Sequence, residues 1–381
     1  MRKKAKILVL SFTSSSIVFA TFLVIGQIHF NVSQTKSMTT FLEQWQNGLT
    51  QDRYIELSER ATQKFELYDE IIKQNFLLDG MVINRDRDGK PVDICDSLLF
   101  SSIRFVALSK MGKTEEASKA WKAISKSQYR GHWHRHPRCK KSTSRDMIIG
   151  VLAALSRKPL GSKNHLIQLS DHIKKRRGFI SYGPPYVSYL SPGLGNVLHR
   201  MLEEEGIAFN LPFAISRSFS TLELDSAASD DGYRTHLNAL MLWLEMEIDP
   251  PASGTFIHFA NKMGRFANKR EVKHVRQQWI SQTLFSKNPK NLFYKWLMLR
   301  STGALNDATK TELLNELLLS EYFPSKRNPN SCDRKADYLW QRSFDEYLLK
   351  DSSCRYEYNG VDFLWITSLL LDSERSLSLA H

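Results

Sequence analysis

The sequence predicts an all-α protein built from helical hairpins, preceded by an N-terminal transmembrane or signal segment. Apolar residues recur at three- and four-residue spacing along most of the 381 residues, which is the period of helices that bury one face. Alternating strand patterns are scarce. Short and long connections alternate between the expected helices, which indicates hairpins arranged in a ring with the long loops gathered on one rim.

The N-terminus carries an export signal. Positive charges at Arg2–Lys6 precede Ile7–Phe30, which holds no charged residue over 24 positions. A span of ~20 residues crosses a bilayer core. We expect residues 1–30 to be a retained anchor, because the apolar run continues past Ala20. The alternative is a signal peptide cleaved near that residue. The positive flank stays in the cytoplasm, so the body would be anchored to the inner membrane and lie in the periplasm or outside the cell, or be secreted after cleavage.

Helical periodicity covers most of the remaining chain. No Pro-rich or Gly/Ser-rich linker divides residues 31–381, which favours a single all-α domain. One small hairpin is expected, pairing Met81–Ile83 with Val92–Ile94 around a turn at Asp88–Gly89. The predicted helices are Thr39–Leu49, Arg53–Phe76, Ser97–Ser109, Thr114–Ser125, Ser144–Ser156, Lys163–Lys175, Leu194–Glu205, Tyr233–Met246, Gly254–Asn268, Lys273–Phe285, Asn291–Leu299, Asp307–Leu319, Tyr338–Leu349 and Val361–Leu371.

The charge balance points to an acidic partner. The formal net charge is +13, which suits an acidic polymer, an anionic membrane surface or nucleic acid. Basic runs at Lys174–Arg177 and Lys262–Arg276 would fit nucleic acid, but export argues against it, and no nucleic-acid partner is predicted. The chain holds no G-x-S-x-G, Walker or H-E-x-x-H motif, which argues against those hydrolase and nucleotide-binding classes.

Four cysteines agree with an oxidising compartment. Each lies in a predicted loop or at its edge, and three pairings are open. We expect the bridges Cys95–Cys139 and Cys332–Cys354, because the first would tie two polar loops together. The chain has no C-x-x-C pair, so a structural zinc site is not expected.

Those two polar loops carry most of the candidate chemistry. Asp96 and Asp146 each stand where a loop enters a helix. The common role of such an aspartate is to cap the helix, and the alternative is acid/base catalysis. Asn84–Asp88 matches the start of a calcium loop but lacks its final glutamate, so an ordinary turn is favoured.

A basic and histidine-rich segment precedes the second of these helices. His132, His134 and His136 alternate, so an extended strand would place them on one face. A metal site is one interpretation. The surrounding arginines and lysines favour an anion-binding patch instead, and neither a metal nor a cofactor is predicted.

Aromatic and acidic residues in other long loops extend the predicted site. Tyr182 and Tyr186 belong to a proline-stiffened loop that suits stacking on sugars. Asp337 is a third candidate catalytic carboxylate, beside Trp340 and Arg342. The predicted substrate-binding residues are His134, Arg135, His136, Arg145, Tyr182, Tyr186, Trp340 and Arg342.

This combination of helical hairpins, an Asp-rich loop before a helix and aromatic loops on one rim resembles the six-hairpin (α/α) toroid group of glycoside hydrolases and polysaccharide lyases. The resemblance covers most of residues 38–375. It implies a toroid with a cleft at the rim that binds a sugar chain, and acid/base chemistry by carboxylates in hydrolases or by Tyr and His in lyases. The chain departs from that group by offering no evident catalytic glutamate, so aspartates would serve.

Two functional hypotheses follow. The first is an exported or membrane-anchored envelope enzyme that cleaves an acidic polysaccharide or cell-wall glycan. The second is a non-catalytic helical module that binds a glycan or a protein of an envelope assembly. Polar residues gathered at one rim favour the enzyme, and the missing glutamate favours the module.

Overall fold

The computed structural model describes the backbone of residues 51–86, 88–92, 94–139, 143–181, 188–208, 233–248, 269–320, 323, 356–357 and 359–372. Within these ranges, none of the helices combines the length and the apolar character that a membrane crossing needs. The predicted export segment, residues 1–30, lies outside them.

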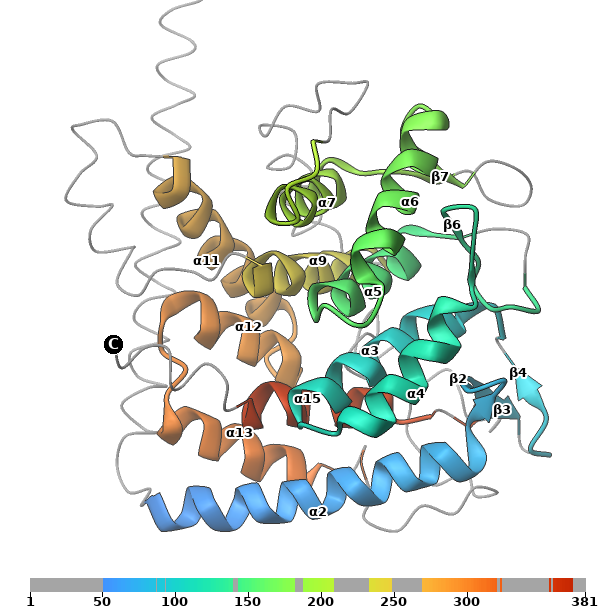
Figure 1. The fold of residues 1–381 in the computed structure, drawn as a ribbon. Coiled ribbons are helices and arrows are strands. Elements are labelled where there is room, and N and C mark those ends of the chain that lie inside the picture. The colour runs from blue at the N-terminus through green and yellow to red at the C-terminus, as the bar shows by residue number, and fades with distance from the viewer. Residues whose placement is uncertain are drawn as a thin grey trace, which may run out of the picture. The chain divides into compact units, whose positions relative to one another are not determined.

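The described chain is mostly helical, as the periodicity predicts (Figure 1). Three predicted helices, Thr39–Leu49, Gly254–Asn268 and Tyr338–Leu349, lie outside the described residues, and each of the others is present with small shifts at its ends. The helices are α2 (Gln51–Asn75), α3 (Ser97–Lys110), α4 (Thr114–Ser125), α5 (Arg145–Ser156), α6 (Ser162–Lys175), α7 (Pro192–Glu204), α9 (Tyr233–Ile248), α11 (Lys269–Lys287), α12 (Leu292–Thr302), α13 (Asp307–Leu319) and α15 (Val361–Leu371).

Some helices are buried on all sides and others on one face only. Helices α3, α5 and α15 are buried along nearly their whole length. Helices α4 and α6 bury only the stripe of apolar residues expected of an amphipathic helix. Helix α3 lies in contact with α4, α5 and α15, and α15 also contacts α2 and α13 (Figure 1). The chain therefore alternates, from α2 to α6, between surface-facing and enclosed helices.

Helices α3 and α5 approach each other closely at a glycine. A Cβ added at Gly150 would lie 3.1 Å from Cδ1 of Leu99 and 3.2 Å from Cβ of Ser102. Gly150 is in the middle of α5, and its two neighbours lie in the first half of α3. The two helices therefore pack at this point with little room for a larger side chain.

Two buried cations fix the position of α3. The Nε atom of Arg104 lies 2.7 Å from Oδ1 of Asp69 in α2, and both side chains are almost fully enclosed. At the end of α3, Lys110 contacts Glu247 at 3.0 Å and also pairs with Asp372. Glu247 belongs to the last turn of α9, and Asp372 caps α15. The C-terminal ends of α3, α9 and α15 therefore meet around one lysine.

Short strands occupy the loops that precede α3, α5, α7 and α15. They are β1 (Leu77–Leu78), β2 (Met81–Val82), β3 (Asn84–Asp86), β4 (Pro91–Val92), β5 (Gln128–Tyr129), β6 (His132–Trp133), β7 (Phe179–Ser181), β8 (Ser188–Tyr189) and β9 (Tyr356–Glu357).

The pairing of these strands corrects the predicted hairpin. Strand β2 pairs with β1 across a turn in which Asp79 and Gly80 both have positive φ, as a type I′ turn requires. Val92 pairs with Asn84 instead of with Met81–Ile83. The predicted turn at Asp88–Gly89 is confirmed, since the N–H of Gly89 donates to the carbonyl of Asp86 at 3.0 Å.

Strand pairing also joins the entries to α3 and α15. Strand β9 pairs with β3 in a three-stranded sheet. Next to it, Nδ2 of Asn359 donates to Oδ1 of Asn84 at 2.7 Å, and Oδ1 of Asn359 accepts from the N–H of Val361 at 2.9 Å. Segments some 270 residues apart in the chain therefore bring the starts of α3 and α15 together.

Replacing Gly150 tests the close contact between α3 and α5. We expect Gly150→Val to reduce the free energy of unfolding by about 2 kcal/mol, because the added carbons must push the two helices apart. The measurement is urea denaturation followed by circular dichroism. Gly112→Val reports a different cost, that of backbone strain, since a Cβ there meets nothing within 4 Å but the φ is +69°. An unchanged midpoint for Gly150→Val would contradict the close contact.

Candidate functional site

The candidate site is organised around the predicted disulfide Cys95–Cys139, which the structure confirms. The two Cα atoms lie 5.6 Å apart. Cys95 stands in the 3-10 turn Ile94–Asp96 before α3, and Cys139 in the loop before α5. The second predicted bridge, Cys332–Cys354, lies outside the described residues. The confirmed bridge joins the loops that introduce two neighbouring buried helices.

Asp96 stands at the start of α3 but does not cap it. No hydrogen bond runs from its side chain to the first turn of the helix. Its Oδ1 atom lies 2.8 Å from a guanidinium nitrogen of Arg135, and the carbonyl of Arg135 accepts from the N–H of Leu98 at 3.0 Å. Arg135, from the loop before α5, therefore provides a partner both for the Asp96 carboxylate and for an N–H in the first turn of α3. The Asp96 side chain is still 47% exposed and accessible from outside.

Asp146 lies in the first turn of α5 and is 7% exposed. Its Oδ1 atom is buried and makes no hydrogen bond. Ser144, the residue at the cap position, makes no side-chain capping bond either. The hydroxyls of Ser97, Thr143 and Ser144 are likewise buried without a partner in the described structure. Buried polar atoms in native proteins are nearly always bonded, so these unpartnered atoms at adjoining helix starts make the region the candidate site.

A third aspartate occupies the same position in α15. Asp362 belongs to the first turn of that helix and is fully buried. Because β9 and β3 join the starts of α15 and α3, Asp362 lies at the same end of the helices as Asp96. The amino ends of helices carry a partial positive charge, which favours carboxylates there.

His136 is enclosed by the loop itself. Its Nε2 atom lies 3.3 Å from the carbonyl of Leu78, and its Nδ1 accepts from the N–H of Arg138 at 3.0 Å. Burial lowers the pKa of His136. Arg138 also makes a two-pronged ion pair with Asp79, at 2.6 and 2.7 Å, and this partner lowers the pKa of the Asp79 carboxyl. The loop around the disulfide is thus fastened to the β1–β2 turn.

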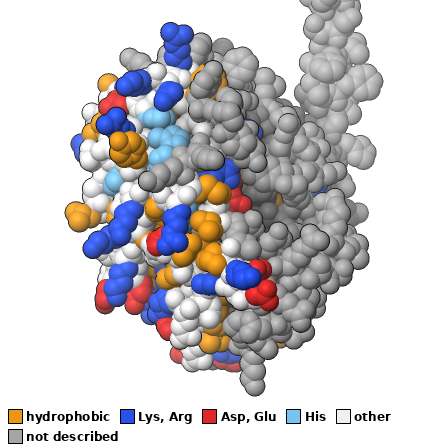
Figure 2. Space-filling model, turned by 90° about the vertical axis from the view of Figure 1, so that its right-hand side faces the viewer, with side chains coloured by type: hydrophobic (Ala, Val, Ile, Leu, Met, Phe, Trp, Pro, Cys, Tyr) orange, Lys and Arg blue, Asp and Glu red, His pale blue; other side chains and the backbone are white. Residues whose placement is uncertain are grey.

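Only two of the three alternating histidines come together. The ring centroids of His132 and His134 lie 4.6 Å apart. The third ring of the cluster belongs to His172 of α6, whose centroid lies 5.1 Å from that of His132. His136 points elsewhere because the extended segment ends after β6. Burial first, then the neighbouring His134, His172 and Arg176, lowers the pKa of His132 to about 4. Figure 2 shows this gathering of histidines, with Lys and Arg side chains close by.

The remaining predicted site residues divide between two groups. Arg145 is half-buried at the start of α5, next to Asp146. The others lie outside the described residues: Tyr182, Tyr186, Asp337, Trp340 and Arg342. Among the described side chains, no group of three or more His, Cys, Asp or Glu residues is placed to hold a metal ion.

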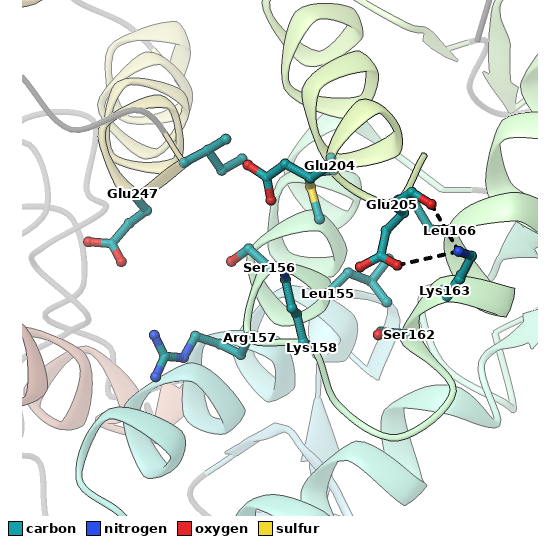
Figure 3. Close-up of a pocket in the computed structure, with 12 residues that line it drawn as sticks. Leu155, Ser156, Arg157, Lys158, Ser162, Lys163, Leu166, Glu204, Glu205 and Glu247 are labelled. Atoms are coloured by element: carbon teal, nitrogen blue, oxygen red, sulfur yellow. Dashed lines mark hydrogen bonds and ion pairs between the residues drawn. The ribbon is translucent and has the colours of Figure 1, made fainter. Parts of the chain in front are cut away.

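A pocket of about 140 Å³ lies at the opposite ends of the helices (Figure 3). It is lined by the last residues of α5, α7 and α9, with Lys163 of α6 donating to the carbonyl of Glu205 at 2.9 Å. Asp146 and Ser156 stand at the two ends of α5, about 15 Å apart at 1.5 Å per residue. The pocket is therefore separate from the candidate site.

Sequence reasoning missed several residues of this region. His172 comes from α6 and Arg176 directly follows that helix, about forty residues after His132, so only the folded chain shows their proximity. Thr143 and Ser144 carried a signal, because hydroxyl residues directly before a helix are expected to cap it. Their failure to do so is visible only in three dimensions.

No protein-family model matches this chain, and neither the curated proteins nor the solved structures compared with it contain a match.

Removal of the disulfide should have a large effect on stability. The bridge closes a loop with a sequence separation of 44 residues. By the chain-entropy relation this is worth about 4 kcal/mol. We expect the double variant Cys95→Ser, Cys139→Ser to lose about that free energy of unfolding in urea denaturation. A loss below about 1 kcal/mol would show that the bridge does not restrain the unfolded chain.

The low pKa of His132 predicts acid sensitivity. The ordinary pKa of histidine is about 6.5, so between that value and about 4 the unfolded chain binds a proton that the folded protein does not. The contribution of His132 to stability is therefore complete above pH 6.5 and is lost as the pH falls toward 4. Between pH 7 and 4.5, the melting temperature of His132→Gln should fall less than that of the wild type. Parallel curves for the two proteins would refute the assignment.

Proposed function

We propose that the protein is an exported or membrane-anchored envelope enzyme that cleaves an acidic polysaccharide or cell-wall glycan. The observation that carries the proposal is the buried carboxylate of Asp146, whose Oδ1 atom has no hydrogen bond at a helix start tied to that of α3. Such a group is costly to a fold unless a ligand or a reaction uses it.

The two carboxylates lie in surroundings that suit different tasks. Asp146 is shielded from water, which suits a proton donor to the leaving sugar. Asp96 is half-exposed and positioned by Arg135, which suits a base that must meet water or the sugar itself. Glycoside cleavage uses two carboxyl groups with such a division of labour. Asp337, outside the described residues, remains a third candidate.

The helical arrangement supports a toroid of hairpins. Enclosed helices α3, α5 and α15 begin at one end, and amphipathic helices such as α4 and α6 cover them. In a toroid the loops before the inner helices form the rim of the cleft. The small strands and the disulfide occur in those loops. We therefore propose that the substrate cleft lies at the starts of α3, α5 and α15.

The disulfide also supports the proposed location. Bridges of this kind form and persist outside the cytoplasm. Together with the charge-free run Ile7–Phe30, Cys95–Cys139 favours a body in the periplasm or outside the cell, held by an anchor or released after cleavage of a signal.

A binding module is the second candidate function. The ion pair between Asp96 and Arg135 favours it, because a carboxylate engaged in this way also explains its position as a structural tie. In a module, residues of the basic loop would hold an anionic glycan without cleaving it.

The substitution Asp146→Asn separates the two functions. Asn keeps the size and shape but cannot transfer a proton, so turnover should fall by at least ~10²-fold. The free energy of unfolding should change by less than about 1 kcal/mol, because the replaced oxygen makes no hydrogen bond. The assay follows new reducing ends and the ultraviolet absorbance of unsaturated products on acidic glycans and peptidoglycan.

The matched control is Asp88→Asn, an exposed carboxylate in the β3–β4 turn, which should leave turnover unchanged. Asp96→Asn should also lose activity. A wild-type protein that binds one of these glycans tightly and cleaves none would reject the enzyme and favour the module.

A further inference from the structure

A tight turn places the histidine cluster on α6. Strands β5 and β6 are joined by Arg130 and Gly131, whose φ values are +51° and +82°. Positive values at both positions define a type I′ turn. A Cβ at Gly131 would lie 2.1 Å from the carbonyl oxygen of Gln168 and 2.8 Å from Cβ of His172. The turn therefore rests directly on the helix, in a contact that only glycine permits.

The turn holds Arg130 at a positive φ, a backbone conformation that residues with a Cβ disfavour. A left-handed φ at a residue other than Gly, Asn or Asp is uncommon and is concentrated at functional positions. The guanidinium carbon of Arg130 lies 5.2 Å from the ring centre of Tyr129, which is 61% exposed. An exposed tyrosine next to an arginine offers a flat face to a sugar and a charge to its acidic group.

Among the described residues, the groups that act on His132 are positive or neutral. They are His134 in the segment after β6, His172 on α6, and Arg176 directly after α6. Burial lowers the pKa of His172, while hydrogen bonds with the backbone of Ile180 in β7 and of Arg130 in the turn oppose the shift. Asp171 is next to His172 in sequence but is exposed and is not among the groups that shift either ring. The imidazoles of His132 and His172 are therefore kept neutral at pH 7.

We propose that Tyr129, Arg130, His132, His134, His172 and Arg176 form an anchoring subsite for the acidic sugar chain, and that this subsite binds more tightly as the pH falls. This inference rests on the proposed function, whose substrate it narrows to a chain bearing carboxylate or sulfate groups. Arg135, the partner of Asp96, directly follows His134 in the chain, so a sugar held here would lead toward the candidate catalytic residues.

The dependence on pH follows from linkage between binding and protonation. Each imidazole that is neutral in the free protein gains a counter-charge when an anionic sugar binds, which raises its pKa in the complex. Binding then takes up protons, so affinity increases as the pH decreases between 7.5 and 5. Neutral sugars provide no counter-charge and should show no such gain.

The test measures binding in the Asp146→Asn protein, so that the probe is not cleaved. Two probes of equal length are used, a hexasaccharide of uronic acids and a neutral hexasaccharide, by calorimetry at pH 7.5 and 5.0. The uronic probe should bind at least tenfold more tightly at pH 5.0. Adding His132→Gln and His172→Gln should remove most of that gain, and Arg130→Ala should weaken binding at both values of pH.

The matched control is His199→Gln, a half-buried histidine of α7 away from the cluster, which should keep the full gain. Three results would reject the subsite. The uronic probe does not bind at all, or it binds equally tightly at the two pH values, or its affinity still increases at pH 5.0 after both histidines are replaced. Preferential binding to vesicles of anionic phospholipid over the uronic probe also rejects it.

Failure of the subsite is distinguishable from failure of the proposed function. If the subsite alone is wrong, the wild type still cleaves glycans and the double histidine variant cleaves the acidic ones as fast as the wild type. If the proposed function is wrong, no glycan is cleaved whatever the histidine substitutions.

Discussion

The enclosure of two cations within helix α3 is the constraint on which the surrounding structure depends. Arg104 and Lys110 belong to a helix that is buried on every side, and unpaired charges in such a place would cost several kcal/mol each. Each must meet a carboxylate from another helix. Asp69 of α2 meets the first, and Glu247 and Asp372, at the ends of α9 and α15, meet the second. The contacts of Lys110 bring the C-terminal ends of α3, α9 and α15 together. The starts of these helices therefore lie away from this end.

The long helices could be predicted because periodicity is a property of many residues at once. Even α3 and α15, which are buried on all sides, were evident from their apolar composition and the turns beside them. Two-residue strands gave no such signal, since alternation needs more positions than β1 or β4 contains. The wrong pairing predicted for Met81–Val82 has a local cause: the Asp79–Gly80 turn pairs that segment with Leu77–Leu78, and Val92 pairs with Asn84 instead.

The candidate site was predictable in its location but not in its bonding. Two loops rich in Asp, His, Arg and Cys marked the place, and the Cys95–Cys139 pairing followed from their joint position before helices. Capping was the expected role of Asp96, yet Arg135 takes its carboxylate, which depends on how the second loop folds over the first. His172 could not be foreseen, because its approach to His132 is set by the fit of Gly131 against α6.

The electrostatics of helix ends favour the starts of α3, α5 and α15 over the pocket as the place for the proposed site. The pocket is bordered by the carbonyl ends of α5, α7 and α9, and the charges of its three glutamates are balanced by Arg157, Lys158 and Lys163, so its lining does not favour an acidic chain. The starts of α3, α5 and α15 are the partly positive ends of their helices and lie beside a loop rich in arginine and histidine, which favours an acidic chain there.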